Sequence, residues 1–211
     1  MTEQLNSMQG SEQKKKPIAL AVTLVLLVIS LILVVMFSAK SIGYKQELQV
    51  ATGEKIVEHF KQLDGKLAHL QTNTSQLVER AGGWDEAAQL LSAHSQVMLQ
   101  DVYDHLAALL ELGKDIEPDK LGDAEADKLA AWHEQQQQLL LQLAAVAQAS
   151  ASDQEQLQQL SQQAAEMKSA VSNFNFKMEG NRNAMIRLAA GFDWLELVKQ
   201  MEEAVKVAAS R

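Results

Sequence analysis

Several residue types that support particular classes of function are missing or scarce in this 211-residue chain. It contains no cysteine, which excludes a disulfide scaffold, a thiol nucleophile and any cysteine-ligated zinc or iron–sulfur site. Its 19 basic residues are outnumbered by 27 acidic ones, and the net charge is −8. That charge disfavours non-specific nucleic-acid binding, because the phosphates would be repelled.

Motifs for nucleophilic, phosphate or metal chemistry are also missing. The sequence has no GxSxG, Walker loop, GxGxxG or HExxH,. Asp101 and His105 lie one helical turn apart, but a catalytic metal needs three supported ligands and His105 also fits a core position. We therefore expect no enzymatic activity, no cofactor and no metal. The histidines considered were His59, His69, His94, His105 and His133.

One long apolar run stands out at residues 17–37, PIALAVTLVLLVISLILVVMF, which carry no charge. A helix of this length reaches roughly 30 Å, the thickness of the hydrocarbon layer. A cleaved secretory signal is the alternative, but its apolar region is usually only about 7–15 residues. The exit sequence Phe37-Ser38-Ala39 also places a bulky residue where a small one belongs. The run predicts an uncleaved single transmembrane anchor.

The lysines around this run predict its orientation. Lys14, Lys15 and Lys16 flank the N-terminal end, whereas only Lys40 and Lys45 lie close to the other end. Because positive charge is retained on the cytoplasmic side, residues 1–16 are expected to form a short cytoplasmic tail. Residues 38–211 would then be exported, which in a bacterium means an inner-membrane anchor and a periplasmic domain.

The exported part has a seven-residue apolar repeat among strong helix formers, which predicts all-α structure with helices packed side by side. A first run follows the repeat at Ile56, Phe60, Leu63, Leu67, Leu70, Thr74, Leu77, Ala81, Trp84, Ala88, Leu91, Ser95, Met98, Val102, His105, Leu109 and Leu112. A second run follows it at Leu129, Trp132, Gln136, Leu139, Leu143, Val146, Ser150, Asp153, Leu157, Leu160, Ala164, Met167, Val171, Phe174, Met178, Asn181, Met185, Leu188, Phe192 and Leu195.

Two arrangements of these runs are open. A turn near 113–123, marked by Pro118, would join arms 41–112 and 124–208 into a long antiparallel coiled-coil hairpin. Alternatively, Gly82-Gly83 ends a first helix and a Ser152–Glu155 capping box starts a fourth, which gives an elongated up-down four-helix bundle. Heptad continuity favours the hairpin, and the glycine pair favours the bundle.

The C-terminal stretch 185–201 is more apolar than a single seam requires. One interpretation is a docking surface for a membrane partner, with Phe192, Trp194 and Met201 as anchors. The other is burial against the first arm or a neighbouring protomer. A buried asparagine at Asn181 could set register, although a helix break after Gly180 would explain it equally well.

The segment from Asp101 to Asp127 is strongly acidic. Asp115, Glu117 and Asp119 could form an acidic tip that meets a basic partner. A calcium loop is another possibility, but Lys128 stands where such a loop needs glycine. In the simpler interpretation Asp123 caps a helix. The acidic spacing considered for calcium was Asp123, Glu125, Asp127 and Glu134.

Together these features favour a non-enzymatic, single-pass membrane-anchored scaffold, tether or accessory subunit. It would bind the bilayer through residues 17–37, dock a protein complex of the same membrane or envelope through its helices, and self-associate. The alternatives are a ligand-sensing helical bundle resembling a chemoreceptor sensory domain, and a subunit resembling the inner-membrane half of a phage spanin. No motif ties the chain to either.

Overall fold

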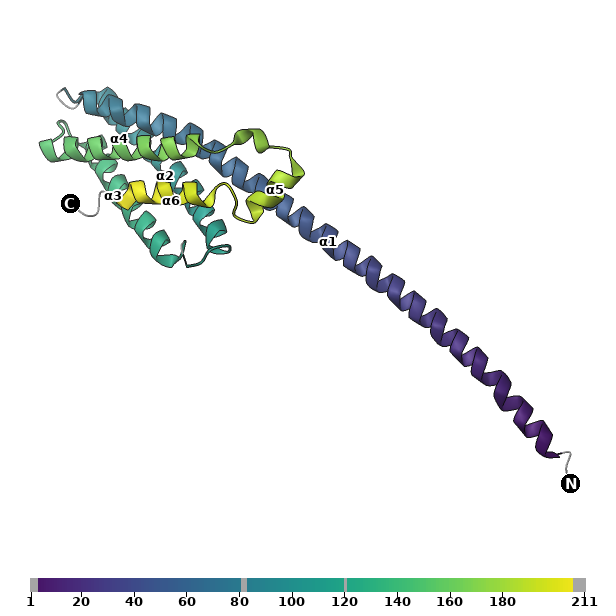
Figure 1. Cartoon of the computed structure of the whole chain (residues 1–211). Helices are drawn as coiled ribbons and strands as arrows, with labels where there is room; N and C mark the ends of the chain where they lie inside the picture. Colours follow the sequence, from purple (N-terminus) through teal and green to yellow (C-terminus); the bar gives the residue numbers. More distant parts are fainter. Residues whose placement is uncertain (1–3, 81–82, 120, 207–211) are drawn as a thin grey trace. The chain divides into compact units, whose positions relative to one another are not determined.

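The computed structural model describes residues 4–80, 83–119 and 121–206, with side chains described from residue 20 to residue 205 within those ranges. The elements are α1 (Gln4–Arg80), α2 (Glu86–Lys114), α3 (Asp123–Ala145), α4 (Ala151–Ser172), the 3-10 turn η1 (Phe176–Met178), α5 (Arg182–Ala189) and α6 (Leu195–Lys206) (Figure 1). No strand occurs within those ranges, so the all-α expectation is confirmed. The chain divides into two units, Met1–Leu48 and Gln49–Arg211.

The first unit contains the apolar part of α1. By length and composition this helix could cross a membrane, and its most apolar window has a mean hydropathy of 3.2 with no part of it buried. Large apolar side chains are exposed along it, from Leu20 to Phe37. The predicted topology signal Lys14, Lys15 and Lys16 falls within α1, but those side chains lie outside the described ones.

The second unit has a core that begins on α1. The first heptad run is buried along this helix, at Ile56, Phe60, Leu63, Leu67, Leu70, Thr74 and Leu77. Thr74 is accommodated because its hydroxyl donates to the carbonyl of Leu70, 2.8 Å away. The heptad spacing therefore identified the inward face of α1 correctly, because residues three and four apart share one face of a helix.

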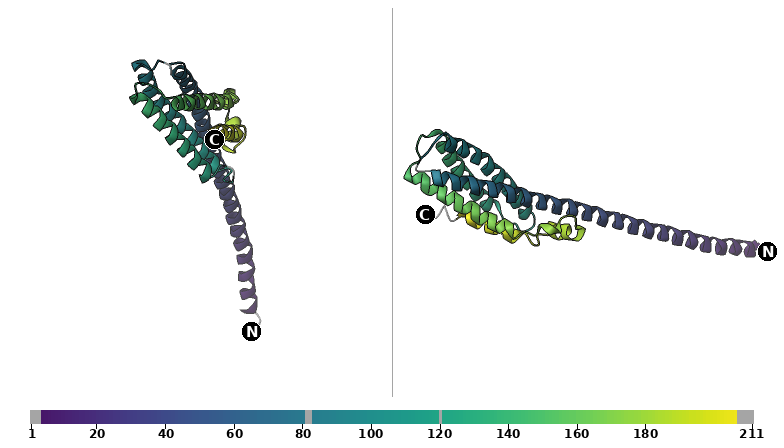
Figure 2. Two further views of the ribbon diagram at one scale, coloured as in Figure 1. Left: turned by 90° about the vertical axis from the view of Figure 1, so that its left-hand side faces the viewer. Right: turned by 90° about the horizontal axis from the view of Figure 1, so that it is seen from above.

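Contacts between helices give their relative directions within this unit. Along α1, the early Asp64 meets Lys168 of α4, and the later Ser75 meets Ser161. Early residues thus pair with late ones, so α1 and α4 run antiparallel. Between α2 and α3, Ser92 donates to the carbonyl of Leu140 and the later Gln96 accepts from the earlier Gln137, so these helices also run antiparallel. The right-hand view of Figure 2 shows α4 beside the part of α1 that belongs to this unit.

The two long arms of the hairpin alternative are each interrupted. α1 ends at Arg80 and α2 begins after Asp85, whose carboxylate accepts from the amide of Ala88 at 2.8 Å. α3 ends at Ala145, and α4 begins after Ser150. Both breaks carry polar caps that satisfy the free amides of a new helix.

The capping box of α4 lies two residues before the predicted one. Ser150 and Asp153 bond reciprocally, with Asp153 N to Ser150 Oγ at 3.2 Å and Ser150 N to Asp153 Oδ2 at 2.8 Å. The assignment of the box to Ser152 and Glu155 was therefore wrong. Ser150 and Asp153, two polar members of the second heptad run, therefore mark the start of a helix. Their side chains accept from backbone amides that have no partner within the helix.

The arm expected at 124–208 is broken a second time, after α4. α4 stops at Ser172, and the chain continues through η1 and α5 before α6. Asn181 caps α5 by accepting from Asn183 N and Ala184 N, and Gly180 before it has φ 75°. The helix-break interpretation of Asn181 is thus correct. α6 then packs against α2, α3 and α4.

A close approach fixes α5 against α1. An added Cβ at Gly53 would stand 2.3 Å from the carbonyl oxygen of Met185. Because no side chain fits there, glycine lets the two backbones meet directly. At Gly65, farther along α1, an added Cβ would meet nothing within 4 Å.

Candidate functional site

The three proposed C-terminal anchors do not share a surface. Trp194 and Met201 are fully buried in the core, whereas Phe192 is 58% exposed. The indole of Trp194 donates to the carbonyl of Leu188 at 2.7 Å, so its polar atom is satisfied inside the protein. The burial interpretation therefore holds for Trp194 and Met201, and the docking interpretation of these two residues was wrong.

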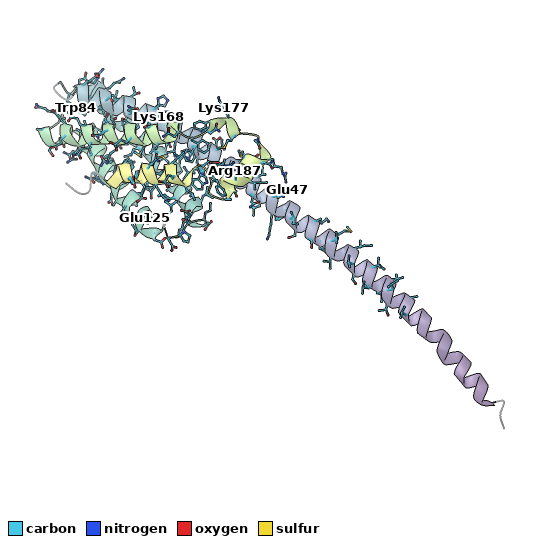
Figure 3. All side chains as sticks on the ribbon, viewed as in Figure 1. Glu47, Trp84, Glu125, Lys168, Lys177 and Arg187 are labelled. Carbon is cyan, nitrogen blue, oxygen red and sulfur yellow. The ribbon has the colours of Figure 1, made fainter. Side chains whose placement is uncertain are left out.

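Phe192 remains a candidate contact residue. It lies between α5 and α6, in a turn where Gly191 and Asp193 both have positive φ, 91° and 70°. The guanidinium of Arg187 lies 5.9 Å from the centre of its ring and also pairs with Asp193 at 2.8 Å (Figure 3). These contacts hold an aromatic side chain outward, which is the form that an interface anchor takes.

The acidic loop between α2 and α3 is partly neutralised by the protein itself. Lys199 of α6 lies 3.5 Å from Glu117, and Lys114 bonds to Asp123 at 2.5 Å. The hydrogen bond and the charge of Asp123 raise the pKa of Lys114, which keeps this lysine protonated at neutral pH,. Asp115 and Asp119 are exposed. Only part of the predicted acidic tip is therefore available to a basic partner.

The calcium spacing does not form a loop. Asp123, Glu125, Asp127 and Glu134 all lie within helix α3, so they cannot wrap around an ion as a calcium loop does,. Gly122 is the N-cap of that helix, which corrects the assignment of Asp123 to that position. Among the described residues, no group of three or more metal-ligating side chains could hold a metal ion.

Histidines gather where α1 meets α2. The Nδ1 atoms of His59 and His105 lie 3.1 Å apart, with both rings partly buried. Burial and then the neighbouring His105 lower the pKa of His59. Asp101, one helical turn before His105, accepts from Lys66 of α1 at 2.5 Å.

A second aromatic contact joins α2 to α3. Tyr103 and His133 stack with their ring centres 4.3 Å apart. Gln137 lies 3.3 Å from Nε2 of the same imidazole. Burial lowers the pKa of His133, and Asp104 opposes this with its negative charge.

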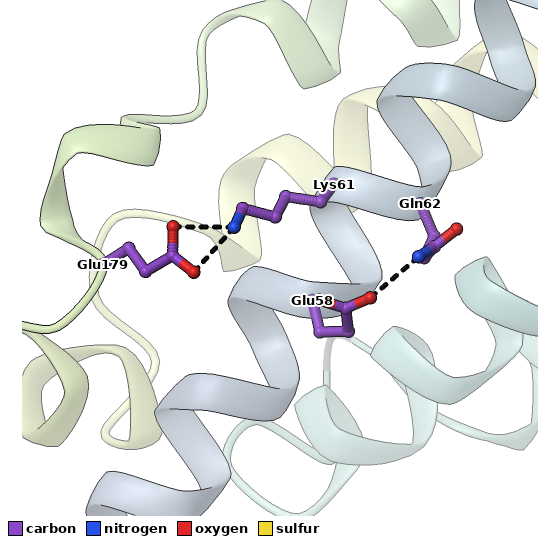
Figure 4. Close-up of polar contacts among 4 residues, drawn as sticks. All are labelled: Glu58, Lys61, Gln62 and Glu179. Carbon is purple, nitrogen blue, oxygen red and sulfur yellow. Dashed lines mark hydrogen bonds and ion pairs between the residues drawn. The ribbon is translucent and has the colours of Figure 1, made fainter.

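Ion pairs from α1 to the C-terminal part were not anticipated from the sequence. Both carboxylate oxygens of Glu179 lie 2.6 Å from Nζ of Lys61 (Figure 4), and Lys168 bonds Asp64. The sequence indicated only one side of these ion pairs, because Lys61 and Asp64 lie beside the heptad positions of α1, where charged residues commonly flank a helix seam. Their partners, more than a hundred residues away, could not be identified from spacing.

Comparisons with known proteins do not assign the chain to a group. No family model, no curated protein and no solved structure matches it. The functional argument therefore depends on the chain's own residues.

Proposed function

We propose that the chain is a non-enzymatic, single-pass membrane protein whose helical unit docks a protein of the same membrane or envelope. In this proposal residues 17–37 cross the plasma membrane, which is the inner membrane in a bacterium. Residues 1–16 stay in the cytoplasm, and residues 38–211 lie on the opposite side. Helices α1–α4 form an antiparallel up-down bundle in the second unit, and α6 completes its core.

The observation that carries this proposal is the contrast within α1. Its large apolar side chains from Leu20 to Phe37 are exposed, whereas those from Ile56 to Leu77 are buried. In water the first set would present a continuous apolar surface far larger than soluble proteins tolerate. A bilayer removes that cost and leaves the helix backbone satisfied by its own hydrogen bonds.

The docking surface would lie on the exposed residues of the second unit. Phe192 offers a held aromatic ring, and Asp115 and Asp119 offer exposed carboxylates. Most of the heptad positions are buried within one chain, so unfilled seams no longer give a physical reason for the expected self-association. A different protein is therefore the preferred partner.

A photo-crosslinking experiment in cells tests this function. The full chain would carry a photoreactive phenylalanine analogue at Phe192, at Asp119 or at Gln158, an exposed control position on α4. We expect one membrane or envelope protein to be captured from Phe192 or Asp119 and not from Gln158. Adducts only between copies of the chain, or the same adducts from all three positions, would contradict the docking role.

A further inference from the structure

All five histidines of the chain lie on helices that contact α2 or on α2 itself. His59 and His105 meet across the α1–α2 contact. Farther along the same two helices, His69 and His94 line one shallow groove. At the partly buried positions of His59 and His105, an apolar side chain would stabilise the helix pair more simply, by burying surface,. The histidines instead introduce groups that change charge near neutral pH.

The His59–His105 pair has a geometry that depends on its protons. At 3.1 Å between Nδ1 atoms, one imidazole must donate and the other accept, because two unprotonated nitrogens would repel. One added proton keeps this arrangement, since an imidazolium donates strongly to a neutral ring. A second proton removes the only acceptor and places two positive charges in contact. The pair therefore tolerates one added proton and opposes two.

We propose that the His59–His105 pair is a proton-sensitive latch that holds α2 against α1 and releases it in mildly acidic surroundings. The inference goes beyond the proposed docking function and does not depend on it. Lowering of the pKa of His59 by burial and by His105 supports it, since the folded contact then disfavours the charged form. The direction is fixed: acid opens the contact, and neutral pH closes it.

Charged groups on the surrounding elements do not neutralise a doubly protonated pair. On α1, Glu58 favours the charged form of His59, and Lys55 opposes it. On α2, Asp101, one turn before His105, is engaged by Lys66. Glu58 is exposed, so solvent screens its effect,.

The neighbouring carboxylates from other elements are also engaged. Glu179, which follows η1, binds Lys61 of α1 with both oxygens. Asp104 of α2 accepts from Gln100 and acts on His133, which α3 contributes. A second proton on the pair would therefore meet repulsion that no bound carboxylate compensates.

Distance measurements between spin labels test the latch. Because the chain has no cysteine, two labels can be placed on introduced cysteines without background. The full chain in detergent micelles would carry labels at Glu54→Cys and Glu111→Cys, both exposed, across the α1–α2 contact. The control pair would be Thr72→Cys and Gln162→Cys, which are exposed on α1 and α4.

Between pH 7.5 and pH 5.0 we expect the α1–α2 distance to lengthen and broaden, while the α1–α4 distance stays constant. The double variant His59→Gln/His105→Gln, which keeps polar uncharged groups, should lose this response. The matched variant His69→Gln/His94→Gln should keep it. An unchanged α1–α2 distance would overturn the latch, as would a response that survives in the first variant or disappears in the second. Equal lengthening of both distances would mean general unfolding and would also overturn it.

A titration of the wild-type chain provides an independent test that needs no substitution in the pair. Imidazole nitrogen signals would be followed by NMR as the pH falls. Coupled groups titrate in two separated steps, so His59 and His105 should take up their two protons at clearly different pH values. A single shared step for the two imidazoles would contradict the proposal.

Discussion

The two units of this protein use apolar side chains in opposite ways, and α1 shares both patterns. From Leu20 to Phe37 its apolar residues are contiguous and exposed, whereas from Ile56 onward they recur at heptad spacing and are buried. A continuous apolar surface on all sides of a helix needs an apolar medium. A single stripe needs only neighbouring helices. The difference shows that the period of the apolar residues, more than their number, decides what a helix requires around it.

The largest expected effect comes from emptying the core of the second unit. Trp194→Ala removes a fully buried indole and its hydrogen bond to Leu188, which should lower the free energy of unfolding by about 3–5 kcal/mol. Phe192→Ala, two residues earlier and exposed, should cost less than about 1 kcal/mol. Chemical denaturation of the full chain in detergent measures both. Equal losses would contradict the different placement of these two rings.

A charge in the apolar run tests the first unit in the same way. Leu27→Arg places a cation near the centre of the exposed run and should cost about 2.5–3.5 kcal/mol of membrane insertion. We expect a smaller fraction of the protein in the membrane pellet, with no change in the unfolding of the second unit. Leu27→Phe is the matched control and should stay in the membrane. Equal retention of both variants would argue against a spanning helix.

Two glycines of α1 sharpen the comparison within the second unit. Gly53→Ala would push a Cβ into the backbone of Met185 and should destabilise the fold by about 1–3 kcal/mol, the usual cost of overpacking. Gly65→Ala enters open space and should stabilise the helix by about 0.5–1 kcal/mol. Thermal unfolding followed by circular dichroism distinguishes the two signs. A stabilising Gly53→Ala would mean that α5 does not contact α1.

The smallest expected effect concerns pH, which should act on the second unit alone because every histidine lies there. Burial lowers the pKa of His133 below its usual 6.5, so the folded chain binds fewer protons than the unfolded chain as the pH falls through that value. Stability is therefore present above about pH 6.5 and decreases below it. His133→Phe keeps a ring against Tyr103 and should reduce this decrease, as measured by unfolding at pH 7.5 and 5.5. An unchanged pH dependence would exclude His133 as a contributor.

Much of the fold could be predicted because it depends on local periodicity. The buried face of α1 and the connection at 115–122 follow from heptad spacing and from Pro118. The polar members of the second run were harder to interpret. Ser150 and Asn181 occupy heptad positions by count, but both are helix caps. Spacing alone does not distinguish a polar core residue from a cap, because both interrupt an apolar series at the same interval.

The candidate site was less predictable than the fold because it depends on tertiary contacts. Trp194 and Phe192 are similar as sequence features, yet one fills the core and the other points to solvent. The chain turns at Gly191 and Asp193, which both have positive φ. A turn of this kind cannot be recognised from the spacing of apolar residues. The His59–His105 contact likewise needs the α1–α2 alignment, which sequence spacing along one helix does not supply.

Site-directed labelling tests the central claim, a single membrane crossing with the helical unit outside the cytoplasm, most directly. Because the chain has no cysteine, Ser7→Cys in the tail and Gln158→Cys on α4 each give one reactive thiol. Bacterial spheroplasts expressing each variant would be treated with a membrane-impermeant maleimide before and after lysis. We predict that Gln158→Cys is labelled before lysis and Ser7→Cys only after it, with both proteins retained in membranes at alkaline pH. Labelling of both before lysis, labelling in the reverse order, or release from the membrane would contradict the account.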